Sequence, residues 1–254
     1  HRIHELYEAL SDTSRARESG FHPQTLRAVR SAVEKFYRDI VEGYKLVARE
    51  PTISSELIDE ITTKPSLVII DFSAEGAPGI PLPVKQLVIG YLARLLYRKF
   101  TEYKIAGDDR YLLFVIEEAQ NYAPNPRTYP VSWSLARDYL ALIATQGRKF
   151  GICLAIVSQR PIFVDPVVLS MLNTWFIHRV PPDDASFVSK LVGVSQTLEK
   201  KLVHLPRGVA LVAGQMNVLG VPMLVRIGPR EVPHRMGATS LVKSLARRYG
   251  LHQP

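Results

Sequence analysis

The sequence predicts an α/β fold in which a mostly parallel sheet is flanked by helices. Two observations carry this prediction. Short apolar runs without polar alternation recur along the chain, and such runs are typical of strands buried on both faces of a parallel sheet. Segments with helical periodicity separate several of them, as in a doubly wound architecture. The predicted strands are residues 67–71, 111–116, 152–157, 175–180, 209–213 and 222–227.

Helical periodicity precedes the first strand, separates the early strands and returns at the end of the chain. The predicted helices are residues 27–36, 52–63, 84–103, 132–145 and 240–249. We therefore expect a helical segment at 1–65 that packs on the core, a core domain at 66–231 and a basic tail at 232–254. The chain begins at His1 rather than Met, which indicates a piece of a longer protein.

Composition limits the class of protein. The 254 residues are 46% hydrophobic and 22% charged, as in an ordinary globular protein. Cys153 is the single cysteine, which excludes disulfides and cysteine-based zinc sites and fits the reducing cytoplasm. No apolar run is long enough to span a bilayer, so we expect no membrane contact. The net charge of +8 favours an anionic partner, with nucleic acid ahead of a membrane.

Acidic residues end two of the predicted strands. Glu117 and Glu118 follow the strand at 111–116, whereas Asp71 stands alone at the end of the strand at 67–71. Ligands of open α/β sheets bind beyond the carboxyl ends of the strands. Two adjacent carboxylates allow one to hold a metal ion through water while the other orients an attacking water. We prefer the pair, and interpret Asp71 as a loop-bonding acid.

Three further residues are candidates for the same chemistry. Gln159 ends the predicted strand at 152–157, where its amide would face the crevice beside the acidic pair and contact a phosphate oxygen or the attacking water. Arg148 precedes that strand and Arg179 follows the strand-like run near Trp175. Phosphoryl transfer needs positive charge on its transition state, often from an arginine of a neighbouring subunit. A solvated surface position is an equal alternative for each arginine.

The combination of four sequence blocks resembles the C-terminal half of HerA, in the HerA/FtsK group of hexameric DNA-pumping ATPases. The blocks are residues 117–124 (EEAQNYAP), 147–151 (GRKFG), 158–161 (SQRP) and 173–174 (NT). The resemblance implies an archaeal RecA-like helicase core with ATP and Mg²⁺, a hexameric ring around DNA, and a nuclease partner of the NurA type in DNA repair.

The resemblance also implies roles for individual residues. Glu117 takes the Walker B acid position that contacts magnesium, and Glu118 that of the catalytic glutamate. Gln159 matches the sensor glutamine. Arg148 and Arg179 match arginines near the subunit boundary. Many Walker B motifs carry Asp where Glu117 stands, which changes the reach to the metal by about one bond.

The chain contains no phosphate-cradling loop. Such a loop needs Gly-Lys followed by Ser or Thr, and none of the 15 glycines here precedes a lysine. The resemblance places this loop upstream of His1, and we therefore expect negligible ATPase activity from this chain alone.

For DNA contact, the candidates are the loop at 125–129 after the acidic strand, with Arg127 and Tyr129, and the loop at 75–83, because translocases hold phosphates with basic and small polar groups. An ordinary surface loop is the favoured alternative for each. Two alternatives stay open. One is a ring ATPase of the conjugation or secretion type. The other is a non-catalytic nucleic-acid-binding or assembly module.

Overall fold

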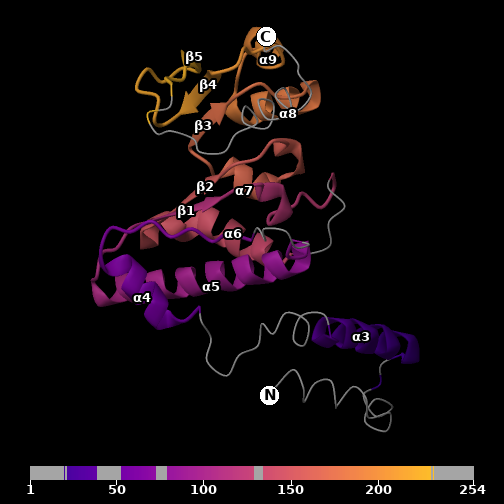
Figure 1. Cartoon of the computed structure of the whole chain (residues 1–254). Helices are drawn as coiled ribbons and strands as arrows, with labels where there is room; N and C mark the ends of the chain where they lie inside the picture. The colour runs from indigo at the N-terminus through magenta and orange to yellow at the C-terminus, as the bar shows by residue number, and fades with distance from the viewer. Residues whose placement is uncertain are drawn as a thin grey trace, which may run out of the picture. The chain divides into compact units, whose positions relative to one another are not determined.

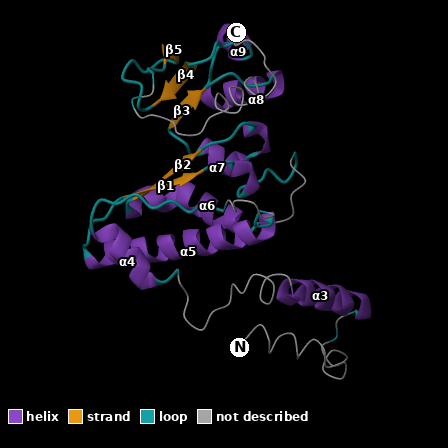
Figure 2. Ribbon diagram, in the orientation of Figure 1, coloured by secondary structure: helices purple, strands orange, loops and turns teal. Residues whose placement is uncertain are grey.

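The computed structural model describes residues 20, 22–38, 53–72, 79–128, 134–229 and 231 (Figure 1). The chain forms two compact units, residues 1–172 and 173–254. Each unit contains both helices and strands, which confirms the predicted α/β class (Figure 2). The helix predicted at 240–249 lies outside the described residues.

Two helices come before the first strand. α3 spans Pro23–Phe36, with His22 as its N-cap and a proline in its first turn, where the missing N–H is no loss. α4 spans Ser55–Thr63, and the Ser54 hydroxyl accepts a hydrogen bond from the Leu57 N–H at its start. Both helices were predicted within a few residues. α4 packs against α5 (Leu82–Ala106), and Ile58 of α4 is fully buried.

The longest element, α5, spans Leu82–Ala106 and ends at Gly107 in the left-handed conformation. Its buried side chains recur at helical spacing, and this face packs against α6, Leu135–Gln146. The helices cross closely at Gly90, where an added Cβ would lie 3.0 Å from the Ala136 nitrogen. α5 and α6 thereby form a helical layer, and α6 also packs on the adjoining strand β2.

The parallel pairing lies in the first unit. β1, Leu112–Ile116, pairs in parallel with β2, Ile152–Ile156, and Leu112 lies opposite Ile152. Gly151 directly precedes β2 and has a φ of +87°. Its carbonyl accepts a hydrogen bond of 2.9 Å from the Leu112 N–H at the beginning of the strand pair. A Cβ at Gly151 would lie 2.0 Å from the Arg110 carbonyl oxygen, so only glycine fits this entry to the pair.

The prediction that the acidic strand is buried on both faces is wrong within the described residues. Along β1, Phe114 and Ile116 are buried, whereas Leu113 and Val115 are 61% and 51% exposed. Successive side chains of a strand point to opposite faces. The helical layer therefore covers one face, and no described element covers the other.

The strand predicted at residues 67–71 is also wrong. These residues do not form a strand, and the side chains of Leu67 and Ile69 are 87% and 78% exposed. An apolar run becomes a strand only when its backbone groups pair with a neighbour. The described part of the chain offers this segment no ladder partner.

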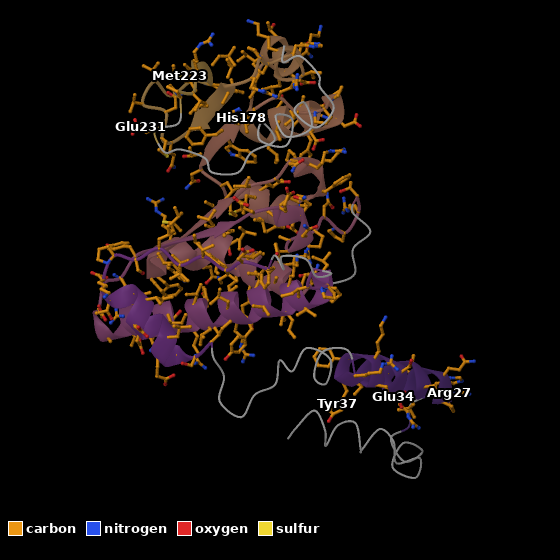
Figure 3. All side chains as sticks on the ribbon, in the orientation of Figure 1. Arg27, Glu34, Tyr37, His178, Met223 and Glu231 are labelled. Atoms are coloured by element: carbon orange, nitrogen blue, oxygen red, sulfur yellow. The ribbon has the colours of Figure 1, made fainter. Side chains whose placement is uncertain are left out.

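The second unit has its own sheet and core. β3 (Thr174–Ile177), β4 (Val209–Gly214) and β5 (Met223–Arg226) pair antiparallel in that order. His178, labelled in Figure 3, follows β3, and its Nδ1 lies 3.1 Å from the Val209 carbonyl oxygen. α8 (Pro182–Val192) and α9 (Gln196–Leu202) complete the unit. The core cluster is Ile177, Ala185, Val188, Leu202, Leu205 and Leu211.

Candidate functional site

The candidate site lies at the carboxyl end of the parallel pair, where the chain leaves β1 through a strained turn. Glu118 has φ 49° and ψ 50°, and it is the only non-glycine residue with positive φ in the described part of the chain. This conformation costs an ordinary side chain about 1–3 kcal/mol, and such strain gathers at functional sites. The turn leads directly into the 3-10 helix η2, Ala119–Asn121.

Two amides hold the Glu118 carboxylate. Gln159 Nε2 donates to Oε1 at 2.7 Å, and Gln120 Nε2 donates to Oε2 at 2.6 Å. Gln120 is held in turn, because its Oε1 accepts a hydrogen bond of 2.7 Å from the Ser158 hydroxyl. A carboxylate offers about four lone-pair positions, so Glu118 retains acceptor capacity toward a third group.

Backbone hydrogen bonds continue the ladder beyond the two strands and bring the polar side chains together. The Val157 N–H donates to the Ile116 carbonyl at 2.9 Å, and the Ala119 N–H donates to the Val157 carbonyl at 3.0 Å. These bonds place Glu118 and Gln159 next to each other at the same end of the paired strands, although the two residues are 41 positions apart in sequence. The contact therefore follows from the parallel register.

Glu117 occupies a different environment from Glu118. It is exposed, and within the described residues its carboxylate has no hydrogen bond or ion pair. It continues the alternation of β1 on the side of Leu113 and Val115, the face that the helical layer leaves open. Because Mg²⁺ is commonly held by one or two carboxylates, waters and substrate phosphates, an unengaged carboxylate fits that ion. The described residues contain no cluster of three or more metal-ligating side chains.

Sequence reasoning missed Gln120 and Ser158 as members of this network. Gln120 was read only as part of a motif, and Ser158 only as the residue before Gln159. The sequence does offer a signal, because each is a polar residue next to a strand end that carries a predicted site residue. Their direct contact at 2.7 Å depends on the pairing of β1 with β2.

The loops that follow the two strands are joined to each other. Asn125 is buried, its N–H donates to the Phe163 carbonyl at 2.8 Å, and its Nδ2 donates to the Ile162 carbonyl at 3.1 Å. The Asp165 N–H donates to the Ala123 carbonyl at 2.8 Å. These bonds fix the course of the chain after Glu118 relative to the chain after Gln159.

A buried ion pair anchors the same region to the helical layer. Asp165 caps α7 (Pro166–Ser170) by accepting from the Val167 and Val168 N–H groups, and it is 1% exposed. Arg137 of α6 donates from Nε to the Asp165 carboxylate at 2.6 Å. The Asp-Pro sequence at 165–166 is a helix-start signal that would have identified the cap, but nothing local indicates Arg137 as its partner.

Of the two predicted arginines, Arg148 does not lie beside Glu118, and Arg179 is not part of the first unit. Arg148 is exposed in η3, Gly147–Phe150, which precedes β2, whereas Glu118 follows β1. Since the strands are parallel, the two residues lie at opposite ends of a pair whose five-residue strands span roughly 16 Å. Arg148 therefore does not reach the Glu118 carboxylate of its own chain. Arg179 belongs to the second unit.

Of the DNA-contact candidates, Arg127 is described and Tyr129 lies outside the described residues. Arg127 is exposed, and its N–H donates to Asn125 Oδ1 at 3.1 Å in the turn at 126–128. Asp71, the second acid considered for the metal, ends a segment that forms no strand. It therefore takes no position on the sheet beside the Glu pair.

This arrangement has defined chemical capabilities. It presents a carboxylate fixed by two amides, beside a second carboxylate that is free to meet a cation. Glu118 can accept a proton from a water, and the carbonyl oxygen of Gln159 can accept a hydrogen bond from the same water. A fixed carboxylate that can accept a proton, next to an acid that can meet a cation, is compatible with hydrolysis of a phosphoanhydride bond.

Comparison with known proteins identifies relatives of the chain. It is 29% identical over 243 residues to the DNA double-strand break repair helicase HerA of Pyrococcus furiosus, and 33% identical over 153 residues to that of Sulfolobus acidocaldarius. The chain is related to the HerA helicases. These alignments cover 80% and 58% of the chain. The chain spans 39% of the length of the first HerA protein and 29% of the second.

Two solved structures match parts of the chain at TM-scores below 0.5. VirB4 of Thermoanaerobacter pseudethanolicus matches with a TM-score of 0.49 and 14% identity, over 90% of this chain and 55% of that chain. The genome packaging NTPase B204 of Sulfolobus turreted icosahedral virus 2, in complex with AMPPCP, matches with a TM-score of 0.41 and 15% identity, over 57% of this chain and 63% of that chain. No family model matches the chain. None of the described helices has the length and apolarity needed to cross a membrane.

Proposed function

We propose that this chain is the acid- and glutamine-bearing part of an ATP-driven DNA translocase or helicase of the HerA type. The observation that carries the proposal is the 2.7 Å contact of Gln159 with Glu118 at the carboxyl end of the parallel pair. It joins the two HerA-like sequence blocks that supply an acid and an amide. The relatives named as DNA double-strand break repair helicases support the substrate class.

Glu118 acts as the general base in this proposal. Gln120 and Gln159 each fix one of its oxygens, so the remaining lone pairs have a defined direction toward an attacking water. Gln159 Oε1 accepts the second proton of that water as a hydrogen bond and thereby orients it. Gln120 and Ser158 are positioning residues, because they act through Glu118 rather than on the substrate.

Glu117 would hold Mg²⁺, directly or through water. Mg-ATP, when bound, would supply a polarised terminal phosphate as the electrophile. Glu117 suits this task because its carboxylate is exposed and, within the described residues, unpaired. The grip on the phosphates needs a Gly-Lys-Ser or Gly-Lys-Thr loop, which this chain lacks. We therefore infer that the chain hydrolyses ATP only as part of a longer protein that contains such a loop.

Arg148 and Arg179 act on the site of a neighbouring copy in a hexameric ring. The position of Arg148 at the amino end of β2 supports an action in trans rather than in its own chain. Arg127 and Tyr129 contact DNA in the central channel, and a nuclease of the NurA type is the partner in end processing. The exposed, positively charged turn at Arg127 supports the first of these assignments.

The decisive test is Glu118→Gln in a longer protein that joins this chain to a Gly-Lys-Thr loop. Loss of a general base lowers turnover by about 10²–10⁴-fold, so we expect steady-state ATP hydrolysis to fall by at least 100-fold while binding of labelled ATP changes less than threefold. Glu60→Gln, the same change at an exposed position of α4, is the control and should leave the rate unchanged. Undiminished hydrolysis by the Glu118 variant would overturn the assignment.

A further inference from the structure

Positive charge is concentrated in the second unit. Residues 173–254 contain 11 Lys and Arg against 4 Asp and Glu, a net of +7, whereas the whole chain carries +8. The first unit is therefore nearly neutral, although it holds the candidate site. Residues 230 and 232–254, which lie outside the described residues, contribute +5 of this net charge, and the described part of the second unit contributes +2. An anionic partner is therefore sought on the second unit, where the described positive charge is local rather than general.

The second unit contains an open hollow of about 310 Å³ between the end of α9 and β5. Its floor is apolar, formed by Leu205, Pro206 and Leu224. This volume is near the lower end of the range for ligand sites, roughly 300–1,000 Å³, and suits one or two aliphatic side chains rather than a cofactor. Leu205 belongs to the core cluster, so the floor of the hollow is a rigid part of the unit.

The rim of the hollow is cationic. Lys200, Lys201 and His204 line it, and all three are exposed. Their backbone groups are hydrogen-bonded, as in the bond from the His204 N–H to the Lys201 carbonyl, but none of the three side chains makes a hydrogen bond or ion pair with another described residue. The charges of Lys200 and Lys201 and the apolar floor beside them therefore have no partner among the described residues.

The adjoining strand extends the cationic rim. Leu224 and Arg226 are both exposed on β5, and they share a face because they are two residues apart. Arg207 directly follows Pro206 and is also exposed. Arg207 and Arg226 do not line the hollow, but they add positive charge next in sequence to Pro206 and on the same face of β5 as Leu224.

We propose that this surface, which we term the α9–β5 hollow, binds an acidic peptide segment of a partner protein through one aliphatic anchor residue. The anchor packs on Leu205, Pro206 and Leu224, and flanking carboxylates pair with Lys200 and Lys201. Interfaces of this kind gain their affinity from a desolvated apolar anchor, while rim charges steer the partner. The proposal goes beyond the proposed function, because it does not depend on ATP hydrolysis.

The lining of the hollow favours a peptide over nucleic acid. A phosphate backbone is held by polar and cationic groups, and it makes no use of an apolar floor. Unpaired bases bind by stacking on aromatic rings, but no Phe, Tyr or Trp lines the hollow. In an acidic peptide, the carboxylates can pair with the lysines of the rim while a neighbouring aliphatic side chain packs on the apolar floor.

Fluorescence anisotropy on this chain would test the proposal with a panel of fluorescein-labelled 12-residue peptides that carry one Leu, Ile or Met between Asp and Glu residues. We expect the best peptide to bind at least tenfold more weakly to the Lys200→Glu/Lys201→Glu variant and to the Leu224→Ala variant. Lys190→Glu, an exposed charge reversal on α8 that does not line the hollow, should change the dissociation constant less than twofold. Replacing the anchor of the peptide by Ala should weaken binding at least tenfold.

Three outcomes would overturn the proposal. One is that no peptide of the panel binds. Another is that binding survives replacement of the anchor or falls equally in the Lys190 control, which would indicate charge alone. The third is that a 20-base-pair duplex binds at the same residues while no peptide displaces it, which would make this a nucleic-acid surface. Circular dichroism melting of each variant, together with the milder Lys201→Gln, separates loss of binding from loss of fold.

Discussion

Replacing Arg137 by Ala should destabilise the first unit far more than an ordinary surface ion pair would. The substitution leaves the Asp165 carboxylate without its side-chain partner while that carboxylate is 1% exposed. Breaking a buried pair costs about 3–5 kcal/mol, and a hydrogen bond to a charged group contributes about 1.5–3 kcal/mol. Arg137 is one-third exposed, and Asp165 keeps two backbone donors. We therefore expect a loss of about 2–3 kcal/mol in the free energy of unfolding.

The control is Lys104→Ala. Lys104 and Asp109 are 2.7 Å apart, nearly the same distance as in the Arg137–Asp165 pair, but both side chains are more than half exposed. Exposed pairs contribute about 0–1 kcal/mol. The difference in stability loss between the two variants therefore reports the effect of burying an ion pair at a nearly constant distance between the charged atoms.

Urea unfolding followed by far-ultraviolet circular dichroism would measure both losses. With an m value of about 2–3 kcal/mol/M, the Arg137 variant should lose about 1 M in its midpoint. The double variant Arg137→Ala/Asp165→Asn should recover part of the loss, because Asn caps a helix without leaving a buried charge. A loss for Arg137→Ala no larger than that for Lys104→Ala would refute the reasoning.

Two further predictions concern the glycine before β2 and the acid of α4. Gly151→Ala places a Cβ 2.0 Å from a carbonyl oxygen, whereas the Cβ of Gly107→Ala meets no atom within 4 Å at a similar positive φ. In urea unfolding, Gly151→Ala should lower the free energy of unfolding by at least about 2 kcal/mol more than Gly107→Ala does. Equal losses would show that the Cβ at residue 151 is not crowded. Two hydrogen bonds lower the pKa of the Asp59 carboxyl below its ordinary value, the larger effect coming from Tyr103 and the smaller from Lys99. A lowered folded-state pKa gives stability that is present above the unfolded-state pKa and is lost as the pH falls through the folded-state value. The stability difference between the wild type and Asp59→Asn should therefore be full at pH 7 and shrink below about pH 4, and a difference that stays constant from pH 7 to pH 3 would contradict this linkage.

Sequence periodicity predicted the elements well where local structure and packing agree. α4, α5 and α6 carry apolar residues at helical spacing together with end signals such as Ser54 and Gly107, so both propensity and capping indicate the same boundaries. The placing of Gln159 near Glu118 was also predictable, because the carboxyl ends of adjacent parallel strands meet at one edge.

The sequence by itself determined the α/β class, the helices α3 to α6, the strands β1 to β5, and the acids and amide that follow β1 and β2, but not the helices α7 to α9. Only the tertiary structure decided which apolar runs are covered, and therefore why Leu113 remains exposed and residues 67–71 form no strand. It also decided the left-handed turn at Glu118, the distance of Arg148 from it, and the Arg137–Asp165 pair. The physical reason is that the spacing of apolar residues indicates which face of a segment can be buried. Whether that face is buried, and against which residues, depends on segments far away in the chain.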